Sequence, residues 1–92
     1  MITETSQSPT KVYLFIRHVV TDSRDLGIIV QCFSTKEAAV TALKQWRDDE
    51  IKYVTEFNYE IVTDEPEEFF AYDGGWYACD HSIGYIEEHE IH

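Results

Sequence analysis

Residues 34–47, STKEAAVTALKQWR, contain the one long helical pattern of the chain, and the strands expected on either side of it define the fold. The run begins with Ser34, Thr35, Lys36 and Glu37, which together form a capping box. In this motif the Ser34 hydroxyl accepts the backbone N–H of Glu37, and the Glu37 carboxylate accepts the N–H of Ser34. The sequence therefore predicts a helix that starts at Ser34.

The apolar residues of this helix share one face. Ala39, Leu43 and Trp46 follow each other at i, i+4 and i+7, the spacing of a helix that packs one stripe against a core. Three carboxylates follow at residues 48–50, and carboxylates are unfavourable at the negative end of a helix dipole. If the helix continued past residue 50, all three carboxylates would become part of it. We therefore expect the helix to end at residues 48–50.

Two strands are expected before the helix. Residues 11–20 alternate with a period of two, and both faces are largely apolar, which is typical of a central strand. Residues 21–25 are turn-forming, and residues 26–33 give a second apolar, β-branched run. The short connection predicts a β-hairpin.

Alternation returns after the helix. Residues 53–62 show a period of two and predict a third strand. Residues 63–66 form a break that ends in Pro66. Residues 67–70 fit either a helical turn with Pro66 at its first position or the lead into another strand.

A hairpin is expected near the C-terminus. Asp73 and Gly74 lie between the aromatic segments 70–72 and 76–78, and Asp-Gly favours a type I′ turn, which needs positive φ at both central residues. Residues 83–91 then predict a last strand. The elements follow the order β-β-α-β-β-β, so the expected fold is α+β, with an antiparallel sheet of four to five strands and one main helix packed on it.

Length and composition predict one domain, over residues 11–92, after a leader at residues 1–10. A chain of 92 residues buries too little surface to form two cores. The first twenty residues carry no export signal, and no apolar run approaches the ~20 residues of a membrane helix, so the cytoplasm is the expected location. In that reducing compartment Cys32 and Cys79 are expected to be free thiols.

The charge of the chain is divided unevenly. Residues 1–47 hold six basic side chains and four acidic ones, whereas residues 48–92 hold fourteen acidic side chains and Lys52 alone as a base. The net charge is −11. Such a field disfavours nucleic acid and anionic membranes as direct ligands and favours a basic protein surface.

No catalytic or cofactor-binding motif is visible. The four glycines form no phosphate-binding run, so no nucleotide or other cofactor is expected, and we expect the chain not to be an enzyme. Cys79, His81, His89 and His92 could supply zinc ligands, but their spacing matches no standard zinc motif. The simpler interpretation is that the last two histidines are polar tail residues, and no metal site is expected.

An aromatic cluster lies among the acids of the second half. It could build the core, or it could form a homodimer or partner-binding patch, because Phe, Tyr and Trp are enriched in interface centres. The surrounding negative charge argues against stacking on nucleic-acid bases. The members of the cluster are Phe69, Phe70, Tyr72, Trp76 and Tyr77.

The acidic half could be a solubilising surface or a mimic of DNA. A small domain needs a net charge of only about 2–8 for solubility. Duplex DNA over the ~30 Å of such a domain carries on the order of 18 phosphates, about half on one side, and fourteen carboxylates match that density. Glu56 and Glu60 are expected on one strand face, where steps of ~6.7 Å arrange charges in rows. The candidate partner-binding residues are Asp48, Asp49, Glu50, Glu56, Glu60, Asp64, Glu65, Glu67, Glu68, Asp73, Glu87, Glu88 and Glu90.

In its length, its single domain and its acidic stretch from Asp48 to Glu90, the chain resembles the small acidic anti-restriction proteins of bacteriophages. The resemblance implies a homodimeric DNA mimic that works without catalysis in the host cytoplasm. Its partner would be a basic DNA-binding protein, either a host restriction endonuclease or a histone-like nucleoid protein. Two other classes share the acidic surface: an immunity or antitoxin protein that neutralises a basic nuclease, and a regulatory domain whose charge only solubilises it.

Overall fold

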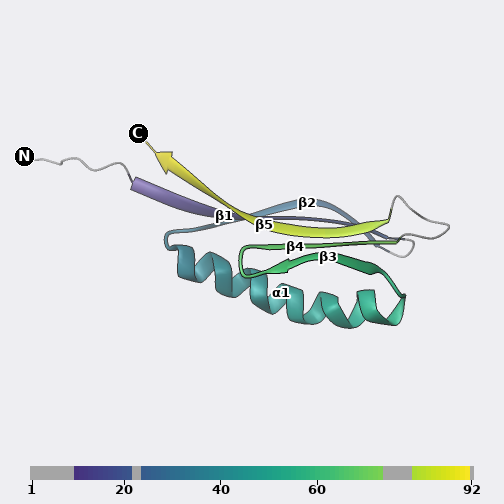
Figure 1. Cartoon of the computed structure of the whole chain (residues 1–92). Helices are drawn as coiled ribbons and strands as arrows, with labels where there is room; N and C mark the ends of the chain where they lie inside the picture. Colours follow the sequence, from purple (N-terminus) through teal and green to yellow (C-terminus); the bar gives the residue numbers. More distant parts are fainter. Residues whose placement is uncertain (1–9, 22–23, 74–79, 92) are drawn as a thin grey trace, which may run out of the picture.

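The computed structural model describes residues 10–21, 24–73 and 80–91. One helix packs on one face of a five-stranded antiparallel sheet, which confirms the predicted α+β fold and the order of its elements (Figure 1). Among the described residues, no helix has an apolar stretch long enough to cross a bilayer. The elements are β1 (Thr10–Thr21), β2 (Arg24–Phe33), α1 (Lys36–Glu56), β3 (Glu60–Glu65), β4 (Glu68–Tyr72) and β5 (His81–Ile91).

The strands lie in the order β2-β1-β5-β4-β3. The predicted β1–β2 hairpin is confirmed, and β1 also pairs with β5 over its whole length, from Thr10 opposite Ile91 to Val20 opposite His81. The first and last strands therefore form the centre of the sheet, and β2 and β3 form its edges. The helix runs beneath the sheet and carries the chain from one edge to the other (Figure 1).

The helix starts one residue later than the capping box predicts. Thr35, not Ser34, is the N-cap, and its Oγ1 accepts the backbone N–H of Ala38 at 3.2 Å. Thr35 has the extended backbone typical of an N-cap, with φ −128° and ψ 149°. A Ser-Thr pair offers two hydroxyls for one cap, and only the backbone geometry selects between them.

The predicted end of the helix at residues 48–50 is wrong, because α1 continues to Glu56. The buried face runs through Ala39, Leu43, Glu50 and Val54, which keeps helical spacing across the acidic run. Glu50 occupies a core position and is 5% exposed. A carboxylate at that position makes a continuous helical stripe look interrupted.

A Schellman motif ends the helix. Asn58 adopts φ 59°, the left-handed conformation that Asn tolerates better than most residues, and the N–H of Tyr59 donates to the Val54 carbonyl at 2.8 Å. The predicted strand at 53–62 is therefore wrong for its first seven residues. The third strand is β3, which begins only at Glu60.

The second half holds one further correction. The expected break begins later than residue 63, since β3 extends to Glu65 and the turn is at Pro66 and Glu67. The strand alternative for 67–70 is right, because β4 starts at Glu68 and pairs with both β3 and β5. The expected Asp73-Gly74 turn and the strand at 76–78 lie outside the described residues, as does the leader except for Thr10, which belongs to β1.

The core is organised around Trp46. Its ring packs edge-on against Phe15 of β1 and Phe69 of β4, with centroid distances of 5.7 Å to each. Both phenylalanines are fully buried. The ring lies over Gly84 of β5, where a Cβ would stand 2.5 Å from a Trp46 ring carbon. Glycine is therefore required at this position for the helix to approach the sheet.

A polar contact accompanies this apolar core. Ser82 of β5 is fully buried, and its hydroxyl donates to Glu50 Oε2 at 2.7 Å. Buried carboxylates are tolerated only where donors replace the lost water. Ser82 therefore helps α1 to keep a carboxylate in its buried face.

Substituting Gly84→Ala should lower the free energy of unfolding by about 1–3 kcal/mol, because the new methyl group overlaps Trp46 in a closely packed site. Chemical denaturation followed by far-UV circular dichroism measures this. The variant G84A/W46L, which removes the obstructing ring, should lose less than the sum of its two single variants. Additive losses would contradict the proposed overlap.

Substituting Ser82→Ala should cost about 1–3 kcal/mol, because a hydrogen bond of the buried Glu50 carboxylate is lost. The double variant E50M/S82A replaces both partners by apolar groups and should recover part of the loss. A double-mutant cycle by urea denaturation tests the coupling, and a coupling energy near zero would show that the contact contributes nothing.

Candidate protein-binding surface

The sheet has one covered face and one open face. On β5, Ser82 and Gly84 point to α1, so the alternating residues Ile83, Tyr85 and Glu87 point away from it. No described element lies over these residues, and Figure 1 shows α1 on one side of the sheet only. We call this second side the open face.

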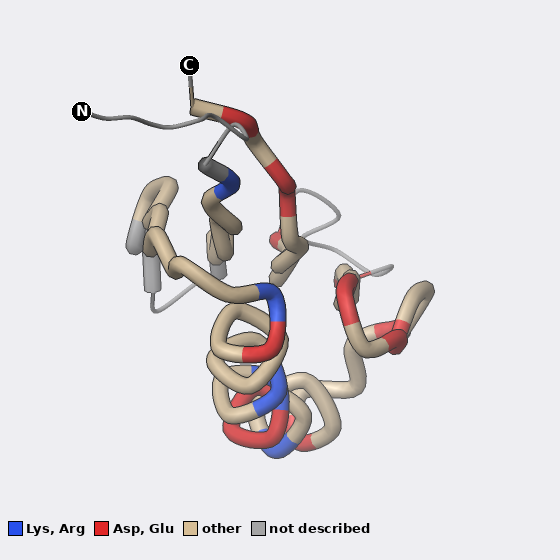
Figure 2. Tube along the Cα trace, turned by 90° about the vertical axis from the view of Figure 1, so that its left-hand side faces the viewer, with Lys and Arg blue, Asp and Glu red and all other residues tan. Residues whose placement is uncertain are grey.

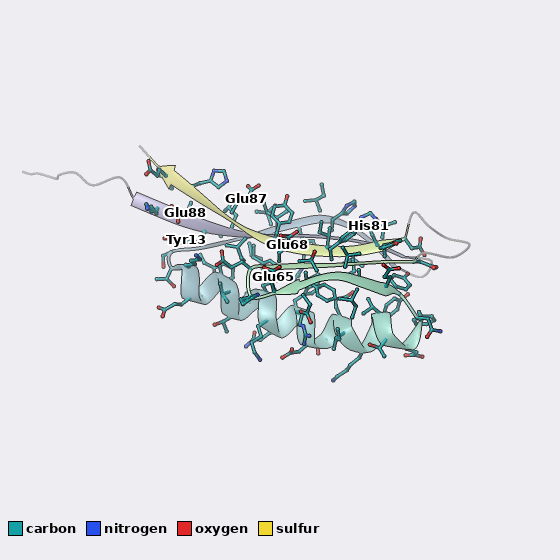
Figure 3. The ribbon with its side chains drawn as sticks, in the orientation of Figure 1. Tyr13, Glu65, Glu68, His81, Glu87 and Glu88 are labelled. Atoms are coloured by element: carbon teal, nitrogen blue, oxygen red, sulfur yellow. The ribbon has the colours of Figure 1, made fainter. Side chains whose placement is uncertain are left out.

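Four carboxylates form an acidic band on the open face: Glu60, Glu65, Glu68 and Glu87. Glu65 and Glu68 are register partners on β3 and β4, and Glu60 lies on the same side because it accepts the Tyr72 hydroxyl at 3.4 Å. Figure 3 shows Glu65 and Glu68 close to the turn between their strands. The strands β3, β4 and β5 contain no lysine or arginine, and Figure 2 shows acidic segments there without basic ones.

Glu65 and Glu68 line a hollow of about 630 Å³. Like charges directly opposite each other on neighbouring strands destabilise a sheet. Neither side chain forms an ion pair with a described residue. Carboxylates beside an aromatic ring are suited to a guanidinium or ammonium group, which can pair with the oxygens and lie over the ring. The other lining residues are Pro66, Glu67, Ile83, Tyr85 and Ile86.

Two further predicted site residues are neutralised by lysines within the chain. Glu67 pairs with Lys36 and Glu88 pairs with Lys11, each at an N–O distance of 3.1 Å. The hydrogen bond to Glu88 raises the pKa of Lys11. These two carboxylates are therefore already engaged by internal cations.

Arg47 engages two more of the predicted residues. Its Nε donates to Asp64 Oδ1 at 2.8 Å, and a second nitrogen bonds the other oxygen, so the pair is bidentate. Arg47 also contacts Asp48, which Lys44 approaches at 3.3 Å. Hydrogen bonds from Arg47 lower the pKa of Asp64, and those from Lys44 and Arg47 lower the pKa of Asp48. This cluster joins α1 to β3.

The remaining predicted acids are spread over the molecule. Glu50 is buried, so it presents no carboxylate to a partner. Asp49 and Glu56 are exposed on α1, and the expected row of Glu56 and Glu60 on one strand face is wrong because Glu56 is the last residue of the helix. Asp73 follows β4 and Glu90 lies near the end of β5. The predicted carboxylates therefore do not share one face.

The histidines form no common site in the described residues. His81 Nε2 lies 3.1 Å from Nδ1 of His18, and His89 contacts Glu87 at 3.0 Å. Eight residue steps of β5, or ~27 Å, separate His81 from His89. No group of three possible metal ligands occurs within the described ranges, outside which Cys79 and His92 lie. Cys32 is an exposed free thiol, as expected.

The predicted aromatic cluster is divided between the two faces. Phe69 is in the core, whereas Phe70 and Tyr72 stack on the open face with centroids 5.9 Å apart. Trp76 and Tyr77 lie outside the described residues. Sequence reasoning missed Tyr85, which lies beside the acidic band, although the alternation along the last strand would have placed it next to Glu87.

The fold and this surface define a small α+β domain in which α1 covers one face of the sheet and the other face carries a band of carboxylates. Searches for similar proteins found no match for the chain among protein-family models, curated proteins or solved structures.

Substituting Asp64→Asn should lower the free energy of unfolding by about 0.5–1 kcal/mol at pH 7, a small value because the ion pair is partly exposed to solvent. The pKa of Asp64 is lowered in the folded state, so its contribution is complete above the unfolded value of about 3.9 and disappears as the pH falls through the folded value. Urea denaturation at pH 7, 4 and 2.5 measures the free energy of unfolding of both chains. The difference between D64N and the unchanged chain should become smaller below about pH 4. Asp49→Asn, at an exposed position, is the control and should have little effect at any of these pH values.

Proposed function

We propose that this chain is a non-catalytic DNA mimic that binds a basic nucleic-acid-binding protein in the cytoplasm. The observation that carries the proposal is the Glu65–Glu68 pair, two like charges held opposite each other on neighbouring strands without a cation from the described residues. This arrangement costs the folded chain stability. A lysine or arginine from a partner relieves the repulsion on binding, so the relief adds to the affinity.

The acidic band has the dimensions of a short segment of nucleic-acid backbone. Five residue steps separate Glu60 from Glu65, or ~17 Å, and Glu68 lies one strand spacing of ~4.8 Å from Glu65. Figure 2 marks further acidic segments along the sheet, whereas α1 carries both acidic and basic ones, and β3, β4 and β5 contain acids without lysine or arginine. Such a field speeds encounter with a basic surface, and close carboxylates then pair with its cations.

The proposed mechanism is competition. The band occupies lysine and arginine side chains that would otherwise contact phosphates, and the partner is then unable to bind nucleic acid. A histone-like nucleoid protein or a restriction endonuclease fits this description. A basic nuclease neutralised by an immunity protein would be bound through the same chemistry.

The test is displacement of a fluorescein-labelled DNA duplex from a histone-like nucleoid protein and from a restriction endonuclease that acts on modified cytosine. The unchanged chain should displace the duplex at 50 mM salt and progressively less at 200 mM salt. The variant E65Q/E68Q should weaken displacement by about three- to tenfold, since it removes two partly exposed charge contacts.

The matched control is D49N/E56Q, which removes the same charge from exposed positions of α1. It should change displacement by less than about twofold. Equal losses in the two double variants would show that only the overall field matters. Absence of displacement from either protein at 50 mM salt would contradict the proposal for these partners, and binding to a basic nuclease toxin instead would favour the immunity class.

A further inference from the structure

Two histidines from distant parts of the chain meet on the open face. His18 lies on β1 and His81 begins β5, and Nε2 of His81 is 3.1 Å from Nδ1 of His18. Both point away from α1, because the residues that follow them, Val19 and Ser82, are buried on the covered side. Figure 3 shows His81 on the sheet, away from the helix. The two rings are partly buried, so the sheet holds them in place while solvent can still reach them.

The geometry of this pair differs from that of a head-on hydrogen bond. Two imidazoles joined by a linear N–H···N bond of 3.1 Å would have ring centroids ~5.3 Å apart. The observed centroid distance is 4.7 Å, and the ring planes make an angle of 69°. The rings are therefore inclined to each other rather than aligned along the line that joins the two nitrogens.

These separations match two imidazoles bound to one metal ion. Nitrogens ~2.1 Å from an ion, with ~95° between the two bonds, lie ~3.1 Å apart, and their ring centroids lie ~4.8 Å apart. The corresponding distances in the pair are 3.1 Å and 4.7 Å. An angle near 90° is typical of the square-planar or tetragonal coordination of copper and nickel, and a small opening reaches the tetrahedral angle of zinc.

The surroundings of the pair favour one class of ion. Calcium and magnesium take oxygen ligands, often from carboxylates, whereas imidazole nitrogen suits nickel, copper and zinc. The register partners of the two histidines carry no carboxylate. The net charge of −11 favours cations over anions at the surface. These register partners are Ile28, Ile83, Val20 and Tyr72.

We propose that His18 and His81 chelate one divalent transition-metal ion of the nickel, copper and zinc group, through Nδ1 of His18 and Nε2 of His81. Water completes the coordination, because the pair faces solvent on the open face. Two protein ligands are fewer than those of a structural zinc site, so we expect a dissociation constant on the order of 100 µM for Ni²⁺ and a smaller one for Cu²⁺. This proposal goes beyond the proposed function and uses residues outside the acidic band.

Titration of the chain with NiCl₂ at pH 7.5, without an affinity tag, tests the proposal by isothermal titration calorimetry. The unchanged chain should bind one ion. The variants H18T and H81T each keep a β-branched residue on their strand, so they should fold normally by far-UV circular dichroism. Each removes one of the two ligand nitrogens and should raise the dissociation constant at least about tenfold. Absence of binding at 1 mM Ni²⁺, or a loss in only one of these variants, would overturn the proposal.

The matched control is H89T, which removes a histidine from an exposed position of the same strand. It should change the dissociation constant by less than about twofold, because one residue far along β5 does not complete the pair. An equal loss in H89T and H81T would contradict the proposed site.

The ion site and the proposed DNA mimicry can fail separately. Glu68 is opposite Tyr85 of β5, four residue steps from His81, so it lies ~14 Å from the histidine pair. That distance exceeds the Debye length of ~8 Å at physiological salt. E65Q/E68Q should therefore keep its affinity for Ni²⁺ within about threefold, and H18T should displace DNA as the unchanged chain does.

Modification by diethyl pyrocarbonate gives a measurement that needs no variant. A neutral imidazole has one nitrogen lone pair, and the reagent cannot attack it once a metal ion is bound there. Saturating Ni²⁺ should slow the modification of His18 and His81 at least about fivefold, read by peptide mass spectrometry, and that of His89 less than about twofold. The same concentration of Mg²⁺ should protect none of them. If Ni²⁺ leaves the pair as reactive as before, or protects His89 equally, His18 and His81 are only hydrogen-bonded and the proposal is wrong.

Discussion

The contact of Trp46 with Gly84 is the constraint on which the rest of the structure depends. The indole ring packs between Phe15 and Phe69 and joins α1 to β1, β5 and β4 at one place. It can do so only because β5 has no side chain beneath the ring. The central pair of strands comes from the two ends of the chain, so this contact also ties the long-range pairing of β1 with β5 to the local helix.

A single helix covers a single face, and the division of the surface follows from that. The face under α1 takes the buried aromatic rings and the Ser82–Glu50 contact. The other face receives every second residue of the same strands, which are aliphatic toward β2 and acidic toward β3. Aliphatic and acidic side chains therefore lie side by side on one face of the sheet.

The two edges of the sheet are protected to different extents. Strand β3 is short, acidic and interrupted by an irregularity between Ile61 and Thr63, and these features discourage pairing with another chain. Strand β2 has ten residues and no charge between Leu26 and Phe33. The apolar side of the open face thus adjoins the less protected edge, and the acidic side adjoins the protected one.

The sequence by itself determined the order of the elements, the first hairpin, the start of the helix to within one residue and the excess of acids in the second half, because these depend on local periodicity, capping and composition. Only the tertiary structure decided that the helix continues through residues 48–50, since Ser82, which donates to Glu50 in the buried face, is 32 residues away in the chain. The same holds for the carboxylates: Lys11, Lys36 and Arg47 engage some of them and leave Glu65 and Glu68 facing each other. Which charges meet depends on strand register and helix placement, and these are properties of the packed molecule rather than of any one segment.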